Sequence, residues 1–414
     1  MMQYGLIGEK LTHSYSKEIH EAIADYDYEL KELAKDELAG FFAAREFRAI
    51  NVTIPYKQDV MQYLDGISGS AREIGAVNTV VNKDGKLFGY NTDYAGMIAL
   101  AEKTGIDFGG AKVLILGTGG TSKTADAAAR SMGAAEVIRV SRHADAAKGT
   151  VSYEDAISLH NDADIIINTT PCGMYPDVDS RALGLDAFVK LRGVLDAVYN
   201  PLRTRLVTDA QERGIAASGG LYMLAAQAVY ACEKFLDREL GTAYVDRAYS
   251  AVLSEKQNIV LCGMPSCGKS TIGKLIAEKT GREFADTDEI ILSRIKVPIA
   301  AYFTVYGEES FRDIESGIIK ELSQRNGLVI ATGGGAVLRK ENVRDLKLNG
   351  KLLFIDRPLE LLTATCDRPL ALDRAMLSRL YSERYDIYRS CCDARIENSG
   401  SLSDVCMRAE ELSV

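Results

Sequence analysis

The stretch that most constrains the fold is Gly-Met-Pro-Ser-Cys-Gly-Lys-Ser at residues 263–270, which fits the pattern G-x-x-x-x-G-K-[ST]. An apolar run precedes it at residues 258–262, and residues 271–279 follow with apolar side chains at helical spacing. A strand, a glycine turn and a helix in this order surround a phosphate with backbone N–H groups. The stretch therefore predicts a nucleotide site in which Lys269 reaches the β- and γ-phosphates and Ser270 binds Mg²⁺.

Other residues of this loop are expected to line the bound nucleotide. They are Gly263, Ser266, Cys267, Gly268 and Thr271. Cys267 stands next to a predicted helix N-terminus, which favours the thiolate form of a cysteine. Two interpretations of Cys267 stay open, a redox-sensitive thiol and an inert small side chain.

The length and composition of the chain exclude several classes of function. The chain has 414 residues, of which 47% are hydrophobic and 26% are charged, as in a globular protein of two or three domains. Its net charge is -9, so we expect no nucleic-acid surface. Small anionic ligands remain compatible with this charge, because a few local arginines suffice to bind them.

The cysteine pattern and the N-terminal residues indicate the cellular compartment in which the protein works. No Cys-x-x-Cys pair and no Cys/His cluster at metal-ligand spacing occurs, so we expect reduced thiols. Residues 1–10 lack the apolar core of a signal peptide, and no apolar run approaches the roughly 18 residues of a membrane span. We expect a cytoplasmic protein that acts on small molecules as a monomer or homodimer, with no nucleic-acid or membrane partner.

A second glycine-rich turn lies between a predicted strand and a predicted helix. The apolar run at residues 111–116 leads into Gly117, Gly119 and Gly120, and a further apolar run follows the helix at residues 136–140. This βαβ pattern with G-x-G-G is a variant of the dinucleotide-binding fingerprint. It predicts a second nucleotide site, separate from the first.

The residues after the second strand of this unit bear on the choice of cofactor. An enzyme that uses NAD usually presents Asp or Glu to the ribose here, whereas this chain has Ser141 and Arg142. A guanidinium suits the 2′-phosphate of NADP, so NADP is favoured. Asp145 follows in a loop and is a poorer ribose ligand, and a solvent-exposed surface arginine is the alternative interpretation of Arg142.

Short apolar runs alternate with helical stretches through residues 1–100, which predicts an α/β domain. Polar residues follow these runs, among them Thr53, Lys57, Asn78 and Asp93. A lysine beside an aspartate can donate the proton that a developing alkoxide needs when hydride reaches a ketone. The pattern predicts a site for a small polyhydroxy substrate beside a nicotinamide.

Five motifs within residues 1–250 together resemble shikimate dehydrogenase, in the order of that family. They are His-Ser-Tyr-Ser at 13–16, Asn-Val-Thr-Ile-Pro-Tyr-Lys at 51–57, Ile-Gly-Ala-Val-Asn-Thr at 74–79, Gly-Tyr-Asn-Thr-Asp at 89–93 and Asn-Thr-Thr-Pro-Cys-Gly-Met at 168–174. The resemblance implies NADPH-dependent reduction of 3-dehydroshikimate to shikimate, with Lys57 and Asp93 as the catalytic pair. The positions that match substrate contacts are Ser14, Ser16, Thr53, Asn78, Tyr199 and Gln227. Those that match cofactor contacts are Gly117, Gly119, Gly120, Arg142, Gly220 and Met223.

Charged residues and glycines recur after the phosphate-binding loop. Asp286 and Asp288 are spaced i, i+2 at a predicted strand end, and Arg312 and Glu315 are spaced i, i+3 on a predicted helix. A glycine triplet and two arginines follow, namely Gly333, Gly334, Gly335, Arg368 and Arg384. This set resembles shikimate kinase over residues 257 to about 395.

The second resemblance implies transfer of the γ-phosphoryl group of ATP to the 3-hydroxyl of shikimate. The positions that match shikimate contacts are Asp288, Arg312, Gly334, Gly335 and Arg384. Lys269, Ser270 and Asp286 match the residues that handle phosphate and Mg²⁺, with Ser270 and Asp286 as metal ligands. Arg368 matches the catalytic arginine of a lid over the transferred phosphoryl group.

Two alternatives stay open. Residues 361–367 lack the further arginine that the kinase family usually carries before Arg368, so the C-terminal half could instead be a shikimate-binding regulatory module. The dehydrogenase half could use quinate as its substrate or NAD as its cofactor.

Three domains are expected. Residues 1–100 and 221–253 form the α/β substrate domain, 101–220 the NADP-binding Rossmann domain, and 257–414 a P-loop kinase domain with a parallel sheet, after a short seam at 254–257. The leading hypothesis is a bifunctional enzyme of aromatic amino-acid biosynthesis that makes shikimate and then shikimate 3-phosphate. Its cofactors would be NADP(H), ATP and Mg²⁺.

Overall fold

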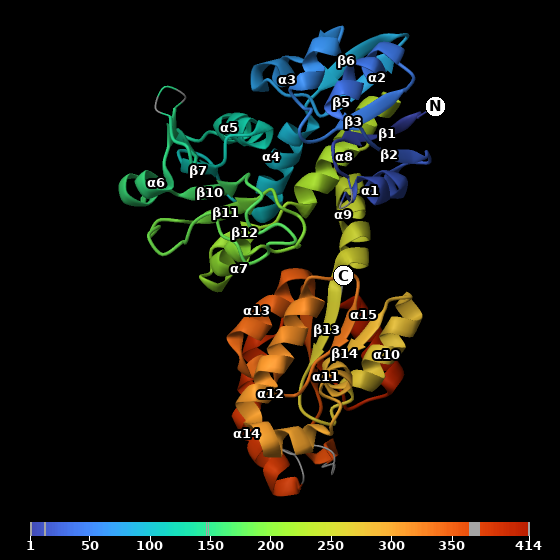
Figure 1. Cartoon of the computed structure of the whole chain (residues 1–414), viewed down its shortest axis with the longest axis vertical. Coiled ribbons are helices and arrows are strands. Elements are labelled where there is room, and N and C mark those ends of the chain that lie inside the picture. Colours follow the sequence, from blue (N-terminus) through green and yellow to red (C-terminus); the bar gives the residue numbers. More distant parts are fainter. Residues whose placement is uncertain (1, 12–13, 146, 148, 364–372, 413–414) are drawn as a thin grey trace. The chain divides into compact units, whose positions relative to one another are not determined.

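The computed structural model describes residues 2–412 except 12–13, 146, 148 and 364–372. Contacts within the chain divide it into two compact units, Met1–Val252 and Leu253–Val414 (Figure 1). The boundary falls inside helix α9 (Thr242–Lys256). The sequence predicted helix only to about Leu253, but the helix continues because the next three residues include no glycine or proline to end it.

The first sheet of the N-terminal unit is mixed, with six strands in the order β2-β1-β3-β5-β6-β4. The strands are β1 (Tyr4–Gly8), β2 (Tyr28–Glu32), β3 (Ala49–Val52), β4 (Gly66–Ile67), β5 (Thr79–Lys83) and β6 (Lys86–Tyr90). The helices are α1 (Ser16–Ile23), α2 (Leu38–Ala44), α3 (Gly69–Ile74) and α4 (Thr92–Thr104), with 3₁₀ turns η1 (Lys35–Glu37) and η2 (Asp59–Tyr63). β1 and β3 are buried at every position, as their apolar sequences predict, and β5 runs antiparallel to β3 and β6.

The second sheet is parallel and has the order β12-β11-β10-β7-β8-β9. Its strands are β7 (Lys112–Leu116), β8 (Glu136–Val140), β9 (Thr150–Val151), β10 (Ile165–Asn168), β11 (Gly193–Asp196) and β12 (Ala216–Ser218). The helices are α5 (Gly120–Ser131), α6 (Tyr153–Leu159) and α7 (Arg205–Glu212). This is the arrangement of a Rossmann fold, in which the strand order reverses between β7 and β10 and a crevice opens at their carboxyl ends.

The chain returns to the first sheet through α8 (Leu221–Leu236). This helix is buried along most of its length and packs against α4, α1, β3 and β5. The alanines of α8 and Gly96 of α4 permit the two helices to approach closely. A Cβ at Gly96 would lie only 2.8 Å from the backbone carbonyl oxygen of Met223. The two sheets of the N-terminal unit are therefore joined by α4 and α8.

The C-terminal unit holds a parallel five-stranded sheet in the order β14-β15-β13-β16-β17. The strands are β13 (Asn258–Cys262), β14 (Phe284–Asp286), β15 (Val329–Ala331), β16 (Gly350–Asp356) and β17 (Ala394–Glu397). The helices are α10 (Lys269–Thr280), α11 (Thr287–Ile295), α12 (Ile299–Ser323), α13 (Lys340–Asn349), α14 (Arg374–Cys391) and α15 (Leu402–Glu411), with 3₁₀ turns η4 (Ala336–Leu338) and η5 (Leu359–Leu361). β13 is central and fully buried, which places the loop that follows it in the middle of the sheet's carboxyl edge.

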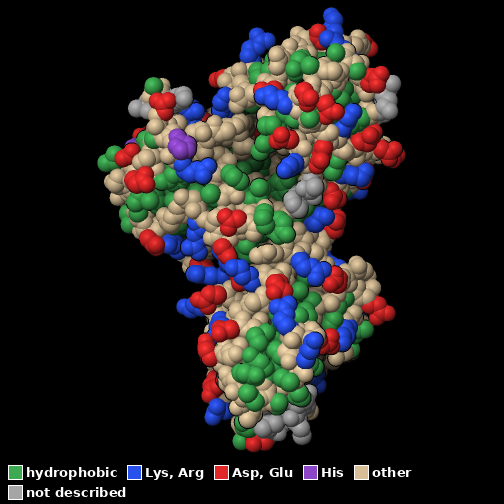
Figure 2. Space-filling model, viewed as in Figure 1, with side chains coloured by type: hydrophobic (Ala, Val, Ile, Leu, Met, Phe, Trp, Pro, Cys, Tyr) green, Lys and Arg blue, Asp and Glu red, His purple; other side chains and the backbone are tan. Residues whose placement is uncertain are grey.

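The helices and the surface charges bear on whether the chain could cross a membrane or bind a polyanion. Among the described residues, no single helix has the length and apolar character of a membrane span, and only α11 and α12 taken together, across a 94° bend, meet that test. On the face drawn in Figure 2, lysines and arginines are interspersed with aspartates and glutamates.

One titratable group lies in the core of the N-terminal unit. His20 is fully buried, its ring stacks 4.1 Å from that of Tyr28, and its Nδ1 lies 2.7 Å from the Tyr26 hydroxyl. Burial lowers the pKa of His20 from 6.5 to about 3, although the neighbouring Asn51 side chain opposes this shift. The folded unit therefore keeps this imidazole neutral at pH values where the unfolded chain protonates it.

This difference between the pKa of His20 in the folded and the unfolded chain predicts that the free energy of unfolding depends on pH through this one side chain. The folded-state pKa is lowered, so the contribution is complete above pH 6.5 and is lost as the pH falls toward 3. Between about pH 7 and about pH 5, His20 should lower the free energy of unfolding by ~2 kcal/mol. Urea unfolding at the two pH values, followed by circular dichroism, should show this loss in the natural chain and not in His20→Phe; equal losses in both proteins would contradict the prediction.

Candidate active sites

The first site is built around an ion pair between Lys57 and Asp93. Lys57 follows β3 and Asp93 lies in the first turn of α4; the Nζ and Oδ2 atoms are 2.6 Å apart, and the side chains are only 16% and 10% exposed. Burial strengthens this attraction, and the carboxylate holds the ammonium group in one direction. The pair can therefore present a proton at a fixed position.

A polar network beside this pair contains two of the predicted substrate residues. The Asn78 Oδ1 accepts a hydrogen bond from the backbone N–H of Thr92 at 2.7 Å, and its Nδ2 donates to Gln227 Oε1 at 3.5 Å. Gln227 comes from α8, so the network joins the first sheet, α4 and α8. Thr79 and Thr92 complete the network through their hydroxyl groups, and sequence reasoning had assigned them no role.

The remaining predicted substrate residues lie on loops of the same unit. Ser14 Oγ accepts from the backbone N–H of Ser16 at 3.2 Å, and the ring of Tyr15 between them lies 5.2 Å from that of Tyr199. Thr53 follows β3, and its carbonyl accepts from the backbone N–H of Tyr56 in the turn that leads to Lys57. Their contact with substrate stays a prediction.

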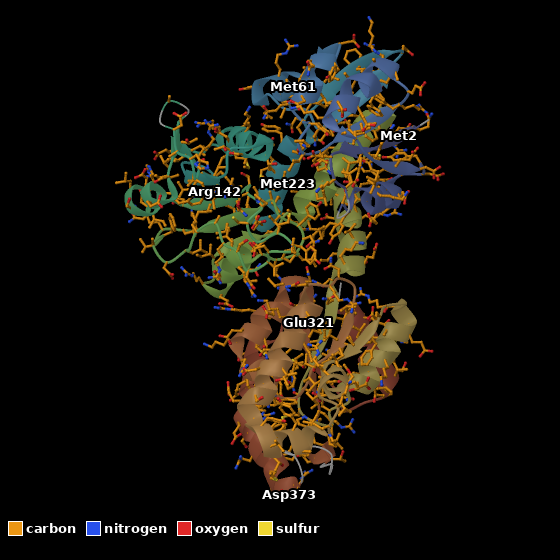
Figure 3. The ribbon with its side chains drawn as sticks, viewed as in Figure 1. Met2, Met61, Arg142, Met223, Glu321 and Asp373 are labelled. Atoms are coloured by element: carbon orange, nitrogen blue, oxygen red, sulfur yellow. The ribbon has the colours of Figure 1, made fainter. Side chains whose placement is uncertain are left out.

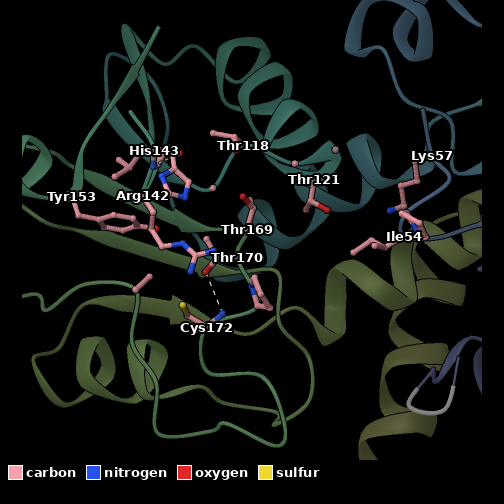
Figure 4. Close-up of a pocket in the computed structure, with 18 of the residues that line it drawn as sticks. Ile54, Lys57, Thr118, Thr121, Arg142, His143, Tyr153, Thr169, Thr170 and Cys172 are labelled. Atoms are coloured by element: carbon pink, nitrogen blue, oxygen red, sulfur yellow. Dashed lines mark hydrogen bonds between the residues drawn. The ribbon is translucent and has the colours of Figure 1, made fainter. Parts of the chain in front are cut away.

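A cavity of about 720 Å³ extends from Lys57 to Arg142 along the carboxyl edge of the second sheet. Figure 4 shows Lys57 and Ile54 at one end and Arg142, His143 and Tyr153 at the other. The predicted cofactor residues Gly117, Gly119, Gly120 and Arg142 all line it. This cavity, with an arginine at one end and Lys57 at the other, fits a bound NADP molecule.

Gly117 shows why this turn needs glycine. Its φ is +111°, and a Cβ there would lie 2.9 Å from the Thr169 hydroxyl. Gly119 and Gly120 leave open space over the start of α5, so a pyrophosphate can approach the backbone N–H groups. Because its three glycines have no side chains, the turn leaves room for a dinucleotide.

Two predicted cofactor residues are not among the residues that line this cavity. Gly220 precedes α8, where a Cβ would meet the backbone of Ala197, and Met223 is 7% exposed (Figure 3). Their cofactor contact stays a prediction. Conversely, the cavity wall includes His143, Tyr153, Thr170 and Arg181, which sequence reasoning did not assign. Thr170 lies in a quoted motif, whereas the other three carried no signal.

A buried carboxyl group supports the loop that bears Tyr199. Asp196 ends β11 and accepts hydrogen bonds from the Thr204 hydroxyl at 2.7 Å, the Val198 N–H at 2.9 Å and the Asn168 amide at 2.9 Å. Burial raises the pKa of Asp196 to about 6, and these hydrogen bonds oppose that rise. The sequence did not single out Asp196, because its partners come from three separate segments.

The second site begins at the loop between β13 and α10. Gly263 and Gly268 have φ values of +145° and +98°, which only glycine adopts readily. Lys269 Nζ donates to the carbonyls of Gly263 at 2.9 Å and Met264 at 3.0 Å, and so lies folded over the loop. Two further predicted loop residues are accessible: Ser266 is partly exposed and Thr271 is exposed. This is the geometry of a phosphate-binding nest.

Cys267 has a structural place in this loop. Its side chain is fully buried, and its carbonyl accepts a hydrogen bond from Asn398 Nδ2 at 2.8 Å. A fully buried sulfur does not meet dissolved oxidants. The burial favours the inert interpretation of Cys267 over the redox-sensitive one.

Ser270 and Asp286 provide the oxygen ligands that Mg²⁺ prefers. The Ser270 hydroxyl donates to Asp286 Oδ2 at 2.6 Å, and Asp286 Oδ1 caps α11 by accepting from the Asp288 N–H at 2.9 Å. Among the described residues no cluster of three or more His, Cys, Asp or Glu side chains forms a metal cage. The pair therefore fits a magnesium ion that takes its other ligands from water and from the nucleotide.

The glycine triplet after β15 collects the predicted shikimate residues. A Cβ at Gly335 would collide with the Arg312 guanidinium, and one at Gly333 would lie 2.7 Å from Asp288 Oδ1. Arg384 Nη1 donates to the carbonyl of Gly334 at 3.2 Å. Two arginines and one aspartate thus surround bare backbone, which suits a ligand with a carboxylate and several hydroxyl groups.

Arg312 is itself held by glutamates. Its Nη1 lies 2.7 Å from Glu315 Oε2, and its Nη2 lies 3.0 Å from Glu308 Oε1. Burial opposes the charge on Arg312, but Glu315 and Glu308 raise its pKa. Glu315 is fully buried, burial raises its pKa, and its Oε1 has no hydrogen-bond partner among the described residues. Arg368 of the predicted lid lies outside the described residues.

The comparisons with known proteins match both halves of the chain. The family model "Shikimate dehydrogenase substrate binding domain" matches residues 6–80, and the model "Shikimate kinase" matches residues 265–411. The NADP(+) shikimate dehydrogenase of Clostridium perfringens (strain SM101 / Type A) is 39% identical over 249 residues, which cover 56% of this chain and 92% of that protein. The corresponding enzyme of Clostridium beijerinckii is 36% identical, over 61% of this chain and 98% of that protein.

Solved structures match the same part of the chain. Shikimate dehydrogenase 1 of Peptoclostridium difficile has a TM-score of 0.56 and 33% identity, over 61% of this chain and 98% of that chain. The Thermus thermophilus shikimate 5-dehydrogenase in complex with NADP(H) and shikimate has a TM-score of 0.55 and 29% identity, over 61% of this chain and 100% of that chain.

Fold and sites together define an α/β enzyme that joins a dinucleotide-binding oxidoreductase to a P-loop kinase, which confirms the predicted fold class. The chain belongs to the shikimate dehydrogenase family and carries a shikimate kinase domain in its C-terminal part.

The buried Arg312–Glu315 pair predicts a large stability effect. Glu315→Ala leaves the buried guanidinium with only the half-exposed Glu308, so the C-terminal unit should lose about 3–5 kcal/mol in its free energy of unfolding. Asp313→Ala removes a 70% exposed carboxylate from a surface pair with Arg339 and should cost less than about 1 kcal/mol. Urea unfolding of both variants measures the difference, and equal costs would show that burial of the pair does not matter.

Proposed function

We propose that the chain catalyses two consecutive reactions, the NADPH-dependent reduction of 3-dehydroshikimate to shikimate and the ATP-dependent phosphorylation of shikimate to shikimate 3-phosphate. The observation that carries the first activity is the Lys57–Asp93 pair, with its 2.6 Å contact, at one end of the cavity that Arg142 closes at the other. The second rests on the phosphate-binding loop together with the arginines around Gly334 and Gly335.

In the first reaction, bound NADPH supplies the hydride. The Lys57 ammonium donates a proton to the oxygen that gains charge as the ketone is reduced, and Asp93 holds that ammonium in place. Asn78 and Gln227, with Ser14, Ser16, Thr53 and Tyr199, hold the hydroxyl and carboxylate groups of the substrate. The buried position of the pair keeps competing water away from the proton.

In the second reaction, bound MgATP supplies the phosphoryl group. Lys269 neutralises phosphate charge, and Ser270 and Asp286 hold the metal. Arg312 and Arg384 orient shikimate over Gly334 and Gly335, while Asp288 accepts the proton of the reacting hydroxyl. We further propose that the chain works in the cytoplasm as a monomer or homodimer.

Single substitutions should separate the two activities. Lys57→Met removes the proton donor and should slow NADPH oxidation with 3-dehydroshikimate by about 100- to 10,000-fold, with ADP release from ATP and shikimate unchanged. Lys269→Met should slow ADP release from ATP and shikimate and leave NADPH oxidation with 3-dehydroshikimate unchanged. Lys35→Met, which changes a 79% exposed lysine, is the matched control and should alter neither rate. If the natural chain released ADP no faster than Lys269→Met, the kinase assignment would fail in favour of the regulatory module.

Arg142 should set the preference for NADPH. Arg142→Gln removes a charged hydrogen bond worth about 1.5–3 kcal/mol, so the KM for NADPH should rise by about 10- to 150-fold while the KM for NADH changes little. Arg130→Gln, on the exposed face of α5 and outside the cavity, is the control. An equal rise for both cofactors would show that Arg142 does not read the 2′-phosphate.

A further inference from the structure

Two cysteines of the C-terminal unit meet outside both sites. Cys262 is the last residue of β13 and is fully buried, whereas Cys391 is the last residue of α14 and is partly exposed. Both belong to one buried cluster, and each thiol shifts the pKa of the other, so the two side chains lie close together. No role in either reaction uses these thiols.

The packing of the core brings these two residues together. Cys262 pairs in register with Phe354 of β16, and the Phe354 ring stacks on that of Tyr388 at 5.2 Å and 17°. Tyr388 lies one helical turn before Cys391, whose Sγ is 3.6 Å from the Tyr388 carbonyl. A buried strand and a buried aromatic pair thus place the two cysteines on neighbouring elements of one core.

The two thiols have opposite chemical character. The hydrogen bond from Cys262 and the nearby Lys347 ammonium lower the pKa of the Cys391 thiol, against the effect of its partial burial. Burial raises the pKa of the Cys262 thiol well above its usual value. One partly exposed sulfur that ionises readily therefore lies beside a buried thiol, so an oxidised Cys391 has a second sulfur nearby that can attack it.

We propose that Cys391 is a peroxide-reactive modification site and that Cys262 resolves the oxidised Cys391 into a disulfide. The Cys391 thiolate attacks one oxygen of hydrogen peroxide, the O–O bond breaks, hydroxide leaves, and Cys391 becomes a sulfenic acid. The Cys262 sulfur then attacks the Cys391 sulfur, the S–O bond breaks, and the Cys262 proton leaves with the hydroxide as water. The two thiols lose two electrons in total, and peroxide gains them.

The disulfide would act on the phosphate-binding loop, a consequence that rests on the proposed kinase function. The two sulfurs must close to a covalent bond of about 2 Å. Cys262 directly precedes Gly263, where a Cβ would lie only 2.6 Å from the Ile355 carbonyl, so this backbone has little room to move. The other end of the bond is on α14, which carries Arg384 and its contact to Gly334. Oxidation should therefore lower kinase activity.

The test uses the full-length chain, reduced and then treated with hydrogen peroxide. Proteolysis without reductant and mass spectrometry should find the Cys262 and Cys391 peptides linked, and dithiothreitol should separate them. Cys391→Ser and Cys262→Ala should abolish the link, whereas Cys392→Ser, which removes the neighbouring thiol, should preserve it. In Cys262→Ala, Cys391 should accumulate as sulfenic or sulfinic acid. ADP release should fall with the link and return with dithiothreitol.

The other outcomes are decisive too. Unmodified Cys391, or a disulfide of Cys391 with Cys392 or Cys366, would overturn the proposal. A Cys262–Cys391 link without loss of ADP release would keep the modification site and refute its effect on the loop. If the reduced chain released no ADP at all, the proposed kinase function would fail, and the peptide map would still decide the thiol chemistry.

Discussion

Both sites depend on the approach of bare backbone to ligand at the carboxyl end of buried parallel strands. Gly117 follows β7, Gly263 follows β13, and the glycine triplet follows β15. At Gly117 and Gly263 a Cβ would lie within 3 Å of a neighbouring oxygen, and both residues have positive φ. Neighbouring strands with unbroken apolar cores hold these turns at one edge of each sheet, so the fold creates the ligand sites before any charged side chain takes part.

The charges in these sites are held by partners in places from which water is largely excluded. Lys57 has Asp93, and Arg312 has Glu315 and Glu308. Removing such charges from water is costly, and a close partner offsets the cost only when geometry is good. As a consequence, neither cation has to be reoriented when a ligand binds. Such preorganised charge is the main way in which an enzyme lowers a barrier electrostatically.

Much of the fold could be predicted because the information is local. The runs before Gly117 and Gly263 are apolar over all but the first residue of each strand, and the glycines follow at fixed spacing. Tyr153, Arg181 and Asp196 could not be found this way, because their places depend on how distant segments pack. The same reason explains why Cys262 and Cys391 lie close together, which follows from β-sheet register and an aromatic stack. Helix α9 continues through residues 254–256 of the expected seam, because these polar residues are compatible with a helix.

The collision of any Gly335 side chain with Arg312 has a consequence for inhibition. A compound that occupies the space above Gly334 and Gly335 would bind mainly to main-chain atoms and to the arginines that we propose bind the substrate. Resistance usually arises when a side chain grows into the volume of a drug. Here such a change would displace Arg312 as well, so the mutation that excludes the drug would also disable the target.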